Sequence, residues 1–241
     1  MTKAVASLFI VAVSLAAAGT ASADSHAVVD STRLYMDQET KVSLEYWIAR
    51  DRSSRSAAGR TTITRDDLGL VWNLDLDAKT YTETAILNPP APPSRQRLDM
   101  RKLWLDYYEP DYDWTIRETG ASRSFNGFDC REFRASGEAD FAEMSAVYWI
   151  CLAPDVPGAK SFHEYSLTQY RGVSRMAALL KLLEENAAGF CAYREETVEN
   201  SIAPTLRATT TLMTLEEAEA PPGTYEVPSG FSKLDGRGDR R

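Results

Sequence analysis

Few residues in this 241-residue chain have types and spacing that suit catalytic chemistry. Only two histidines occur, His26 and His163. His26 lies in a segment expected to be a loose N-terminus, so His163 is the candidate for a catalytic triad. No Gly-x-Ser-x-Gly motif, which positions the nucleophile of many hydrolases, is present. A lone histidine is more often structural, so we predict that the protein is not an enzyme; a hydrolase that uses His163 is an alternative.

Acidic residues offer little support for a metal site. Asp75 and Asp77 form an Asp-x-Asp pair, but nothing like a complete calcium loop follows it. Turn chemistry explains that pair better. Glu109, Asp111 and Asp113 are typical of an exposed acidic loop. The sequence has neither a C-x-x-C pair nor a Gly-rich phosphate motif, so we predict no metal and no cofactor.

Arginines gather in one stretch of this acidic chain. Arg50, Arg52 and Arg55 lie close together, and Arg60 and Arg65 follow. A guanidinium group matches the oxygens of a phosphate or lipid headgroup, so the first three are candidates for anion binding. The range 50–60 is polar and contains Ser and Gly, which is typical of a solvated turn. Both interpretations stay open.

The N-terminal residues predict export. Lys3 precedes the uncharged apolar run Ala4–Ala18, and an Ala-x-Ala site ends at Ala23. This pattern is typical of a secretory signal peptide over 1–23, which leaves a mature N-terminus at Asp24. No later stretch is long and apolar enough for a transmembrane segment. We expect a periplasmic or secreted protein, with one domain over 24–235 and a flexible tail over 236–241.

Three cysteines in an exported chain suggest one disulfide and one free thiol. The β-prone runs Phe128–Phe133 and Ala146–Leu152 predict a hairpin that folds back near Asp140 and Phe141. That fold brings Cys130 nearly opposite Cys151 and favours this pair. A bridge between Cys151 and Cys191 remains the alternative.

Charge excludes one class of partner. The chain has 27 basic and 35 acidic residues and a net charge of −8. An acidic protein is a poor candidate for nucleic-acid binding, which depends on neutralising phosphates with Lys and Arg.

The remaining pattern predicts the elements. Further strands are expected at Lys41–Ala49, Thr61–Thr84 (a meander), Tyr112–Thr119, Phe190–Glu199 and Leu206–Leu215. Helical segments are expected at Leu98–Tyr108, Ser161–Tyr170 and, most clearly, Val173–Ala188. Because strands and helices do not alternate regularly, we predict an α+β fold with a curved, mainly antiparallel sheet packed on a few helices.

Two apolar faces are expected to meet. Leu68, Leu70, Trp72, Leu74 and Leu76 share one face of the meander, while Met176, Leu179, Leu180 and Leu183 form a stripe on the last helix. We predict that a hydrophobic ligand lies between sheet and helix. The pocket candidates are Leu70, Trp72, Leu74, Trp149, Met176, Leu180 and Leu183.

Four runs carry a family resemblance: ITRDDLGLVWNLDLDAKTYTE, WTIRETGASRSFNGFDCREFRA, AVYWIC and YEVPSGFSKL. In this order, from about Ile63 to Leu234, they resemble a group of bacterial secreted domains related to the periplasmic lipoprotein-carrier superfamily, which has the lipoprotein-localisation-factor fold. The resemblance implies an unclosed antiparallel half-barrel that wraps helices around an apolar cavity, and a tendency to bind acyl chains. It implies no catalytic residues.

We therefore expect a non-enzymatic binder or carrier of a hydrophobic ligand, such as a lipid or an acyl chain. The alternative is an envelope interaction or assembly protein without a small-molecule ligand, which would use an exposed sheet edge or the arginine-rich stretch to hold a protein partner.

Overall fold

A computed structural model of the chain describes residues 23–86, 110–152, 155–186 and 189–234. Within these ranges the strands are β1 (Asp24–Tyr35), β2 (Gln38–Ile48), β3 (Arg52–Ala57), β4 (Arg60–Arg65), β5 (Leu70–Asp75), β6 (Thr80–Ala85), β7 (Asp113–Phe125), β8 (Phe128–Ala139), β9 (Ala142–Leu152), β10 (Gly189–Asn200), β11 (Leu206–Ala218) and β12 (Ser232–Lys233). The helices are α2 (Ala159–Tyr170), the 3₁₀ turn η1 (Ser174–Met176) and α3 (Ala177–Glu185).

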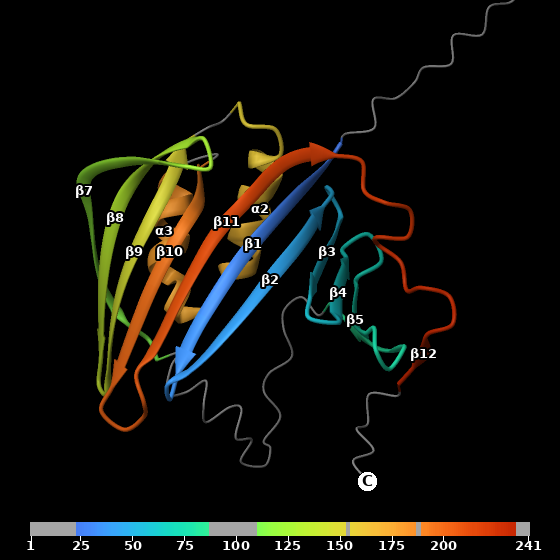
Figure 1. The fold of residues 1–241 in the computed structure, drawn as a ribbon, viewed down its shortest axis with the longest axis horizontal. Helices are drawn as coiled ribbons and strands as arrows, with labels where there is room; N and C mark the ends of the chain where they lie inside the picture. The colour runs from blue at the N-terminus through green and yellow to red at the C-terminus, as the bar shows by residue number, and fades with distance from the viewer. Residues whose placement is uncertain (1–22, 87–109, 153–154, 187–188, 235–241) are drawn as a thin grey trace, which may run out of the picture.

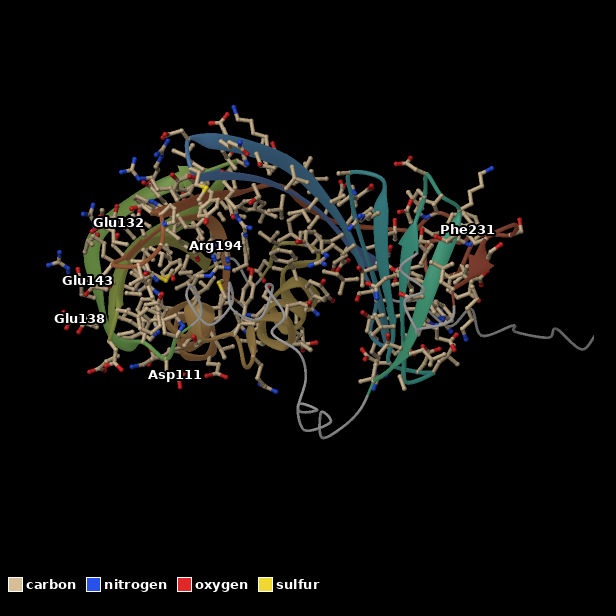
Figure 2. All side chains as sticks on the ribbon, turned by 90° about the horizontal axis from the view of Figure 1, so that it is seen from below. Asp111, Glu132, Glu138, Glu143, Arg194 and Phe231 are labelled. Carbon is tan, nitrogen blue, oxygen red and sulfur yellow. A yellow bond between two sulfur atoms is a disulfide. The ribbon has the colours of Figure 1, made fainter. Side chains whose placement is uncertain are left out.

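All these strands belong to one unclosed sheet with the order β12-β6-β5-β4-β3-β2-β1-β11-β10-β9-β8-β7. Every pairing is antiparallel except that of β12 with β6. The part made of β1, β2 and β7–β11 curves strongly around α2 and α3, and we call it the half-barrel (Figures 1 and 2). The remaining strands, β3–β6 and β12, form a flatter extension that we call the arm. The predicted α+β fold with a curved, mainly antiparallel sheet is confirmed.

The central hairpin has the predicted register. Cys130 pairs with Cys151, and the turn lies between Ala139 and Ala142. The two cysteines form a disulfide with a Cα–Cα distance of 3.9 Å, and Cys191 is free. The favoured pairing is confirmed.

Two stretches expected to lack regular structure are strands. The loose start expected at residues 24–30 is part of β1, which pairs with β2 on one side and β11 on the other. Ala27 and Val29 are buried, but the polar residues between them hide the alternation from a hydrophobic pattern. The turn expected at residues 50–60 contains β3, whose sequence RSSRSA has only one apolar residue. Cross-strand pairing to β2 and β4, rather than apolar patterning, holds β3 in place.

The helices differ in length from the prediction. The helix expected at Val173–Ala188 is η1 followed by the nine-residue α3, because Asn186 at its C-cap has left the helical conformation. The helical turn expected at Ser161–Tyr170 is the twelve-residue α2. The helix expected at Leu98–Tyr108 lies outside the described residues, as do the signal peptide up to residue 22 and the tail after residue 235. None of the described helices is long and apolar enough to span a membrane.

The buried side chains separate the half-barrel from the arm. Tyr148, Ile150 and Leu183 belong to a large cluster between the half-barrel and the helices. The arm has a small cluster of its own, in which Ile63 and Leu74 pack against Tyr225. The meander face therefore does not meet the α3 stripe as predicted. The segment that leads to β12 covers the meander instead, and α3 packs on α2 and β10.

Candidate ligand-binding cavity

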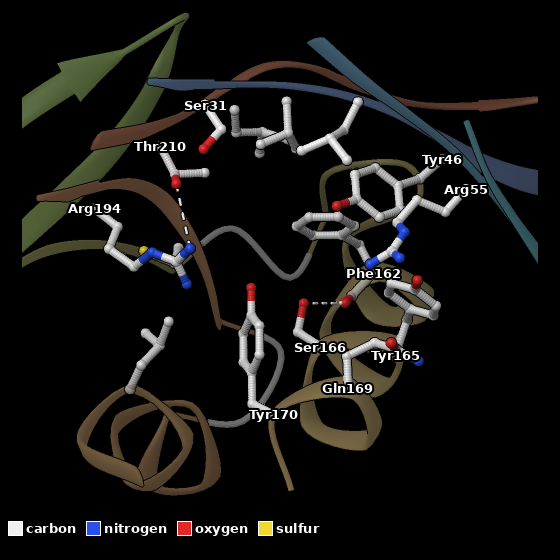
Figure 3. Close-up of a pocket in the computed structure, with 15 residues that line it drawn as sticks. Ser31, Tyr46, Arg55, Phe162, Tyr165, Ser166, Gln169, Tyr170, Arg194 and Thr210 are labelled. Carbon is white, nitrogen blue, oxygen red and sulfur yellow. Dashed lines mark hydrogen bonds between the residues drawn. The ribbon is translucent and has the colours of Figure 1, made fainter. Parts of the chain in front are cut away.

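A cavity of about 240 Å³ lies between the concave face of the half-barrel and the two helices (Figure 3). Its walls come from β1, β2, β3, β10 and β11 on the sheet side and from α2 and α3 below. The lining residues are Val29, Ser31, Leu44, Tyr46, Arg55, Phe162, Tyr165, Ser166, Gln169, Tyr170, Leu179, Cys191, Arg194, Thr210 and Leu212.

The sheet side of the cavity has an aliphatic centre. Val29, Leu44 and Leu212 lie on the three adjacent strands β1, β2 and β11. Val29 is the register partner of both other residues, and paired residues project to the same face of a sheet. The centre of the sheet wall is therefore a continuous apolar surface, and Phe162 and Leu179 add apolar surface from the helices.

Arg194 is one of two charged residues among the described cavity walls, and it is already paired. Its Nε lies 3.2 Å from Oε1 of Glu196, a carboxylate whose side chain is 2% exposed. One Nη donates to Oγ1 of Thr210 at 3.2 Å, and the other lies 3.3 Å from Sδ of Met176. Burial is the largest single effect on Arg194 and lowers its pKa, but Glu196, Tyr170, Cys191 and Tyr148 together raise it, and the net direction is upward. Arg194 therefore stays charged and is held firmly by its neighbours.

Three tyrosines supply neutral hydroxyl groups. Burial raises the pKa of Tyr46 and Tyr165, and raises that of Tyr170 to about 12. The hydroxyl of Tyr170 points into the cavity between Arg194 and Ser166 (Figure 3). The rings of Tyr46 and Tyr165 meet edge to face, with centroids 5.7 Å apart. Each phenol can donate a hydrogen bond to a ligand at neutral pH.

The free thiol also lines this cavity. Burial raises the pKa of Cys191 to about 12, and its Sγ lies 3.1 Å from the carbonyl oxygen of Tyr193 as a weak donor. A neutral thiol is not a nucleophile, so Cys191 behaves as an apolar wall residue.

Arg55 is the second charged wall residue, and its environment differs from that of Arg194. It lies on β3, opposite Tyr46 of β2 in the register, and its side chain is exposed. It forms no ion pair within the part of the chain that the structure describes. Its positive charge lowers the pKa of Tyr46 and Tyr165 against the larger effect of burial.

The other two anion-binding candidates line an adjacent cavity. Arg50 and Arg52 line a second cavity of about 230 Å³, which shares the walls Tyr165 and Gln169 with the first. Asp66 and Glu164 also line the second cavity, and Arg52 stacks over the ring of Tyr225 at 4.9 Å. The structure thus divides the predicted arginine trio between two neighbouring sites.

The seven predicted pocket residues do not line the main cavity. Leu70, Trp72 and Leu74 lie on the arm, where Trp72 and Leu74 pack in the cluster around Ile63. Trp149 packs against Phe125, with ring centroids 5.3 Å apart. Met176 and Leu183 are buried in the half-barrel core, and Leu180 is half-buried. Leu179 is the residue of α3 that reaches the cavity, because a shift of one residue turns a helix position by about 100°.

His163 has a structural contact. It is buried on α2, and its Nδ1 lies 2.6 Å from the carbonyl oxygen of Gly189, so the nitrogen must be the donor. The bond ties α2 to the start of β10. Within the described residues no carboxylate pairs with His163, and it does not line the cavity.

Sequence reasoning missed Arg194, Glu196 and the three tyrosines of the wall. One signal was available in β10. Arg194 and Glu196 occupy alternate positions of a strand whose inward residues otherwise include the buried Val198. Charges of opposite sign at inward strand positions indicate a buried ion pair, since neither charge is buried alone.

Comparison with known proteins adds distant structural neighbours. No family model matches the sequence, and no curated protein does either. The structure is similar to a LolA superfamily protein from Nitrosomonas europaea, at 8% identity over 83% of this chain and 88% of that chain, with a TM-score of 0.27. A DUF1329 family protein from Desulfovibrio piger matches at 10% identity over 86% of this chain and 91% of that chain, with a TM-score of 0.32.

The chain is also similar to PNGF-II, at 6% identity and a TM-score of 0.34, over 89% of this chain and 31% of that chain. The chain thus spans about a third of the length of PNGF-II. At these identities and TM-scores the neighbours carry no argument about this chain.

Proposed function

We propose that this chain is an exported, non-enzymatic binding protein that holds an aliphatic ligand, such as an acyl chain, in the half-barrel cavity. The cavity itself carries the proposal. Protein interiors are close-packed, and voids larger than a water molecule are few. What distinguishes this space of about 240 Å³ is its aliphatic centre between sheet and helices, an apolar surface that a ligand would cover.

The size of the cavity limits the ligand. The volume of about 240 Å³ is many times the roughly 10–15 Å³ that a single water needs. This space suits a short aliphatic chain or the end of a longer one. Each methylene buried there contributes about 0.8 kcal/mol before the costs of association.

Export is supported by two independent features. The disulfide between Cys130 and Cys151 is typical of proteins outside the reducing cytoplasm. The apolar N-terminal run and its Ala-x-Ala site predict the signal that would carry the chain there.

The test compares two Ser→Phe variants, one on the cavity side of the sheet and one on the side exposed to solvent. Ser31 lines the cavity, while Ser43 on the neighbouring strand is exposed and alternates with the wall residue Leu44. Ser31→Phe should fill the cavity, and Ser43→Phe adds the same ring outside it. Calorimetric titration of delipidated protein with decanol and decanoate should show saturable binding that Ser31→Phe weakens at least about tenfold and Ser43→Phe leaves unchanged.

Solvent extraction of protein purified without detergent completes the test. A stoichiometric aliphatic compound should be recovered with the protein. If no compound is recovered and folded protein binds neither probe, the binding function is wrong, and the interaction-protein alternative takes its place.

A further inference from the structure

We propose that the cavity selects amphiphiles with an anionic headgroup, a carboxylate or a phosphate, and that Arg55 binds this group at the cavity mouth. The inference rests on the proposed function and adds the chemical class of the ligand. Four observations lead to it: the charge of the cavity walls, the different partners of the two arginines, the exposure of Arg55, and the neutral hydroxyls beside it.

The charge of the cavity walls has one sign. Among the described lining residues two are arginines, and none is Asp or Glu. The chain as a whole carries −8, so a cavity lined only by positive charge runs against its composition. Such a lining favours an anion and disfavours a cation.

The two arginines differ in how many hydrogen-bond donors they can offer to a ligand. Arg194 already interacts with Glu196, Thr210 and Met176, and its charge is matched by a buried carboxylate. Arg55 forms no hydrogen bond or ion pair within the described part of the chain, so its fork of donors is available to a ligand. The arrangement favours Arg55 as the headgroup partner.

Exposure places the headgroup at the water-accessible end. The side chain of Arg194 is only 19% exposed, whereas Arg55 is exposed and lies on the opposite side of the cavity (Figure 3). A charged headgroup is costly to bury completely, so the exposed arginine is the better partner. The tail would then extend from Arg55 beneath Val29, Leu44 and Leu212.

The neighbours of Arg55 complete the site. The charge of Arg55 lowers the pKa of Tyr46 and Tyr165, but burial raises it by more and keeps both phenols neutral. They are therefore donors, and two neutral donors beside a guanidinium suit the oxygens of a carboxylate or phosphate. Arg50 and Arg52 are poorer candidates, because Asp66 and Glu164 share their cavity and offset their charge.

The experiment separates headgroup from tail. Delipidated protein is titrated with decanoate, decyl phosphate and decanol, and separately with inorganic phosphate. Wild-type protein should bind both anionic amphiphiles at least about tenfold more tightly than decanol, since hydrogen bonds to charged groups contribute more than neutral ones. Arg55→Gln should remove that preference and leave the affinity for decanol unchanged, while Arg55→Lys keeps part of it. The control is Arg60→Gln, which removes another exposed charge, from β4.

Each outcome decides one point. If decanol binds as tightly as decanoate, or if Arg55→Gln weakens both by the same factor, headgroup selection is wrong while the proposed binding function stands. If inorganic phosphate alone displaces decanoate at equal concentration, the site binds simple anions, and the amphiphile inference is overturned. If no probe binds to folded protein, the proposed function fails and takes this inference with it.

Discussion

The half-barrel and the arm belong to one sheet, yet they protect their apolar faces in different ways. The half-barrel curves around two helices, and the interior includes a buried ion pair and a cavity. The arm is covered by the segment that ends in β12, and among the residues that the structure describes its hydrophobic cluster has three buried members, Ile63, Leu74 and Tyr225. Figure 2 shows Arg194 inside the curve and Phe231 on the arm.

The comparison shows that regular alternation along a strand does not identify the binding face. The clearest alternation in the sequence, residues 68–76, forms the small core of the arm, and its ends Leu68 and Leu76 are 53% and 40% exposed. The cavity instead lies where alternation is interrupted by polar residues such as Ser31, Arg194 and Thr210. A filled core needs only apolar surface, whereas a ligand site needs space and polar groups that contact a polar part of the ligand.

The largest difference between the two regions should be the reactivity of a cysteine thiol in the cavity wall compared with one on the arm. Burial raises the pKa of Cys191 from 9.0 to about 12, so the reactive thiolate at pH 8 should be about a thousandfold scarcer than for an ordinary thiol. Iodoacetamide labelling of native protein should be slower by roughly two to three orders of magnitude, because burial also limits access and the higher nucleophilicity of a more basic thiolate offsets only part of the loss. A variant with Cys191→Ala and Thr84→Cys, which moves the thiol to an exposed position on the arm, should react at the ordinary rate.

The sign of the pH dependence follows from the same shift. A pKa raised in the folded state gives stabilisation that is complete below about pH 9 and is lost as pH rises towards 12. Cys191→Ala should therefore lose less stability than wild type over this range in denaturant titrations. Labelling of Cys191 as fast as that of the thiol on the arm would show that the cavity wall is open to solvent.

The next largest difference should be the loss of unfolding free energy when an ion pair is broken in each region. Glu196 is 2% exposed and lies 3.2 Å from Nε of Arg194. Glu196→Gln leaves the guanidinium without a buried partner, and we expect unfolding in urea to lose about 3–5 kcal/mol. The matched control is Glu83→Gln on the arm, which breaks a 2.7 Å ion pair with Lys233 whose side chains are 29% and 47% exposed, and which can still accept a hydrogen bond from Trp72. Because water screens such partly exposed pairs, this variant should lose no more than about 1 kcal/mol. If Glu196→Gln and Glu83→Gln lowered the unfolding free energy equally, the distinction between a buried ion pair in the half-barrel and a surface pair on the arm would be wrong.

Much of the fold could be predicted because it depends on local pattern. The hairpin register that pairs Cys130 with Cys151 follows from two β-prone runs and the turn between them. The central position of β1 could not be predicted, because it depends on pairing with β11, nearly 200 residues later, and not on the composition of β1. Such long-range pairing leaves no mark within a single strand.

The candidate site was less predictable than the fold. The sequence groups Arg55 with Arg50 and Arg52, but the structure places Arg55 in one cavity and the other two in a second cavity. The side of the sheet to which each side chain projects decides this separation, and sequence spacing in a turn does not show it. Leu179, and not the predicted Leu180, lines the cavity. An apolar stripe on a helix covers several neighbouring positions, and only tertiary packing decides which one meets the cavity.

The smallest expected effect tests whether the two cores are energetically separate. Ile63 and Ile150 are both buried, with exposures of 1% and 0%, and they belong to the arm and the half-barrel respectively. Replacing either by Val removes one methylene and should cost about 0.5–1.5 kcal/mol. In hydrogen exchange, Ile63→Val should speed exchange only in β4–β6 and leave decanoate affinity unchanged, because the arm can open locally. Ile150→Val should speed exchange throughout the half-barrel, since its side chain lies in the cluster that holds the helices. Faster exchange in β8–β10 on changing Ile63 would show that the arm and the half-barrel unfold as one unit.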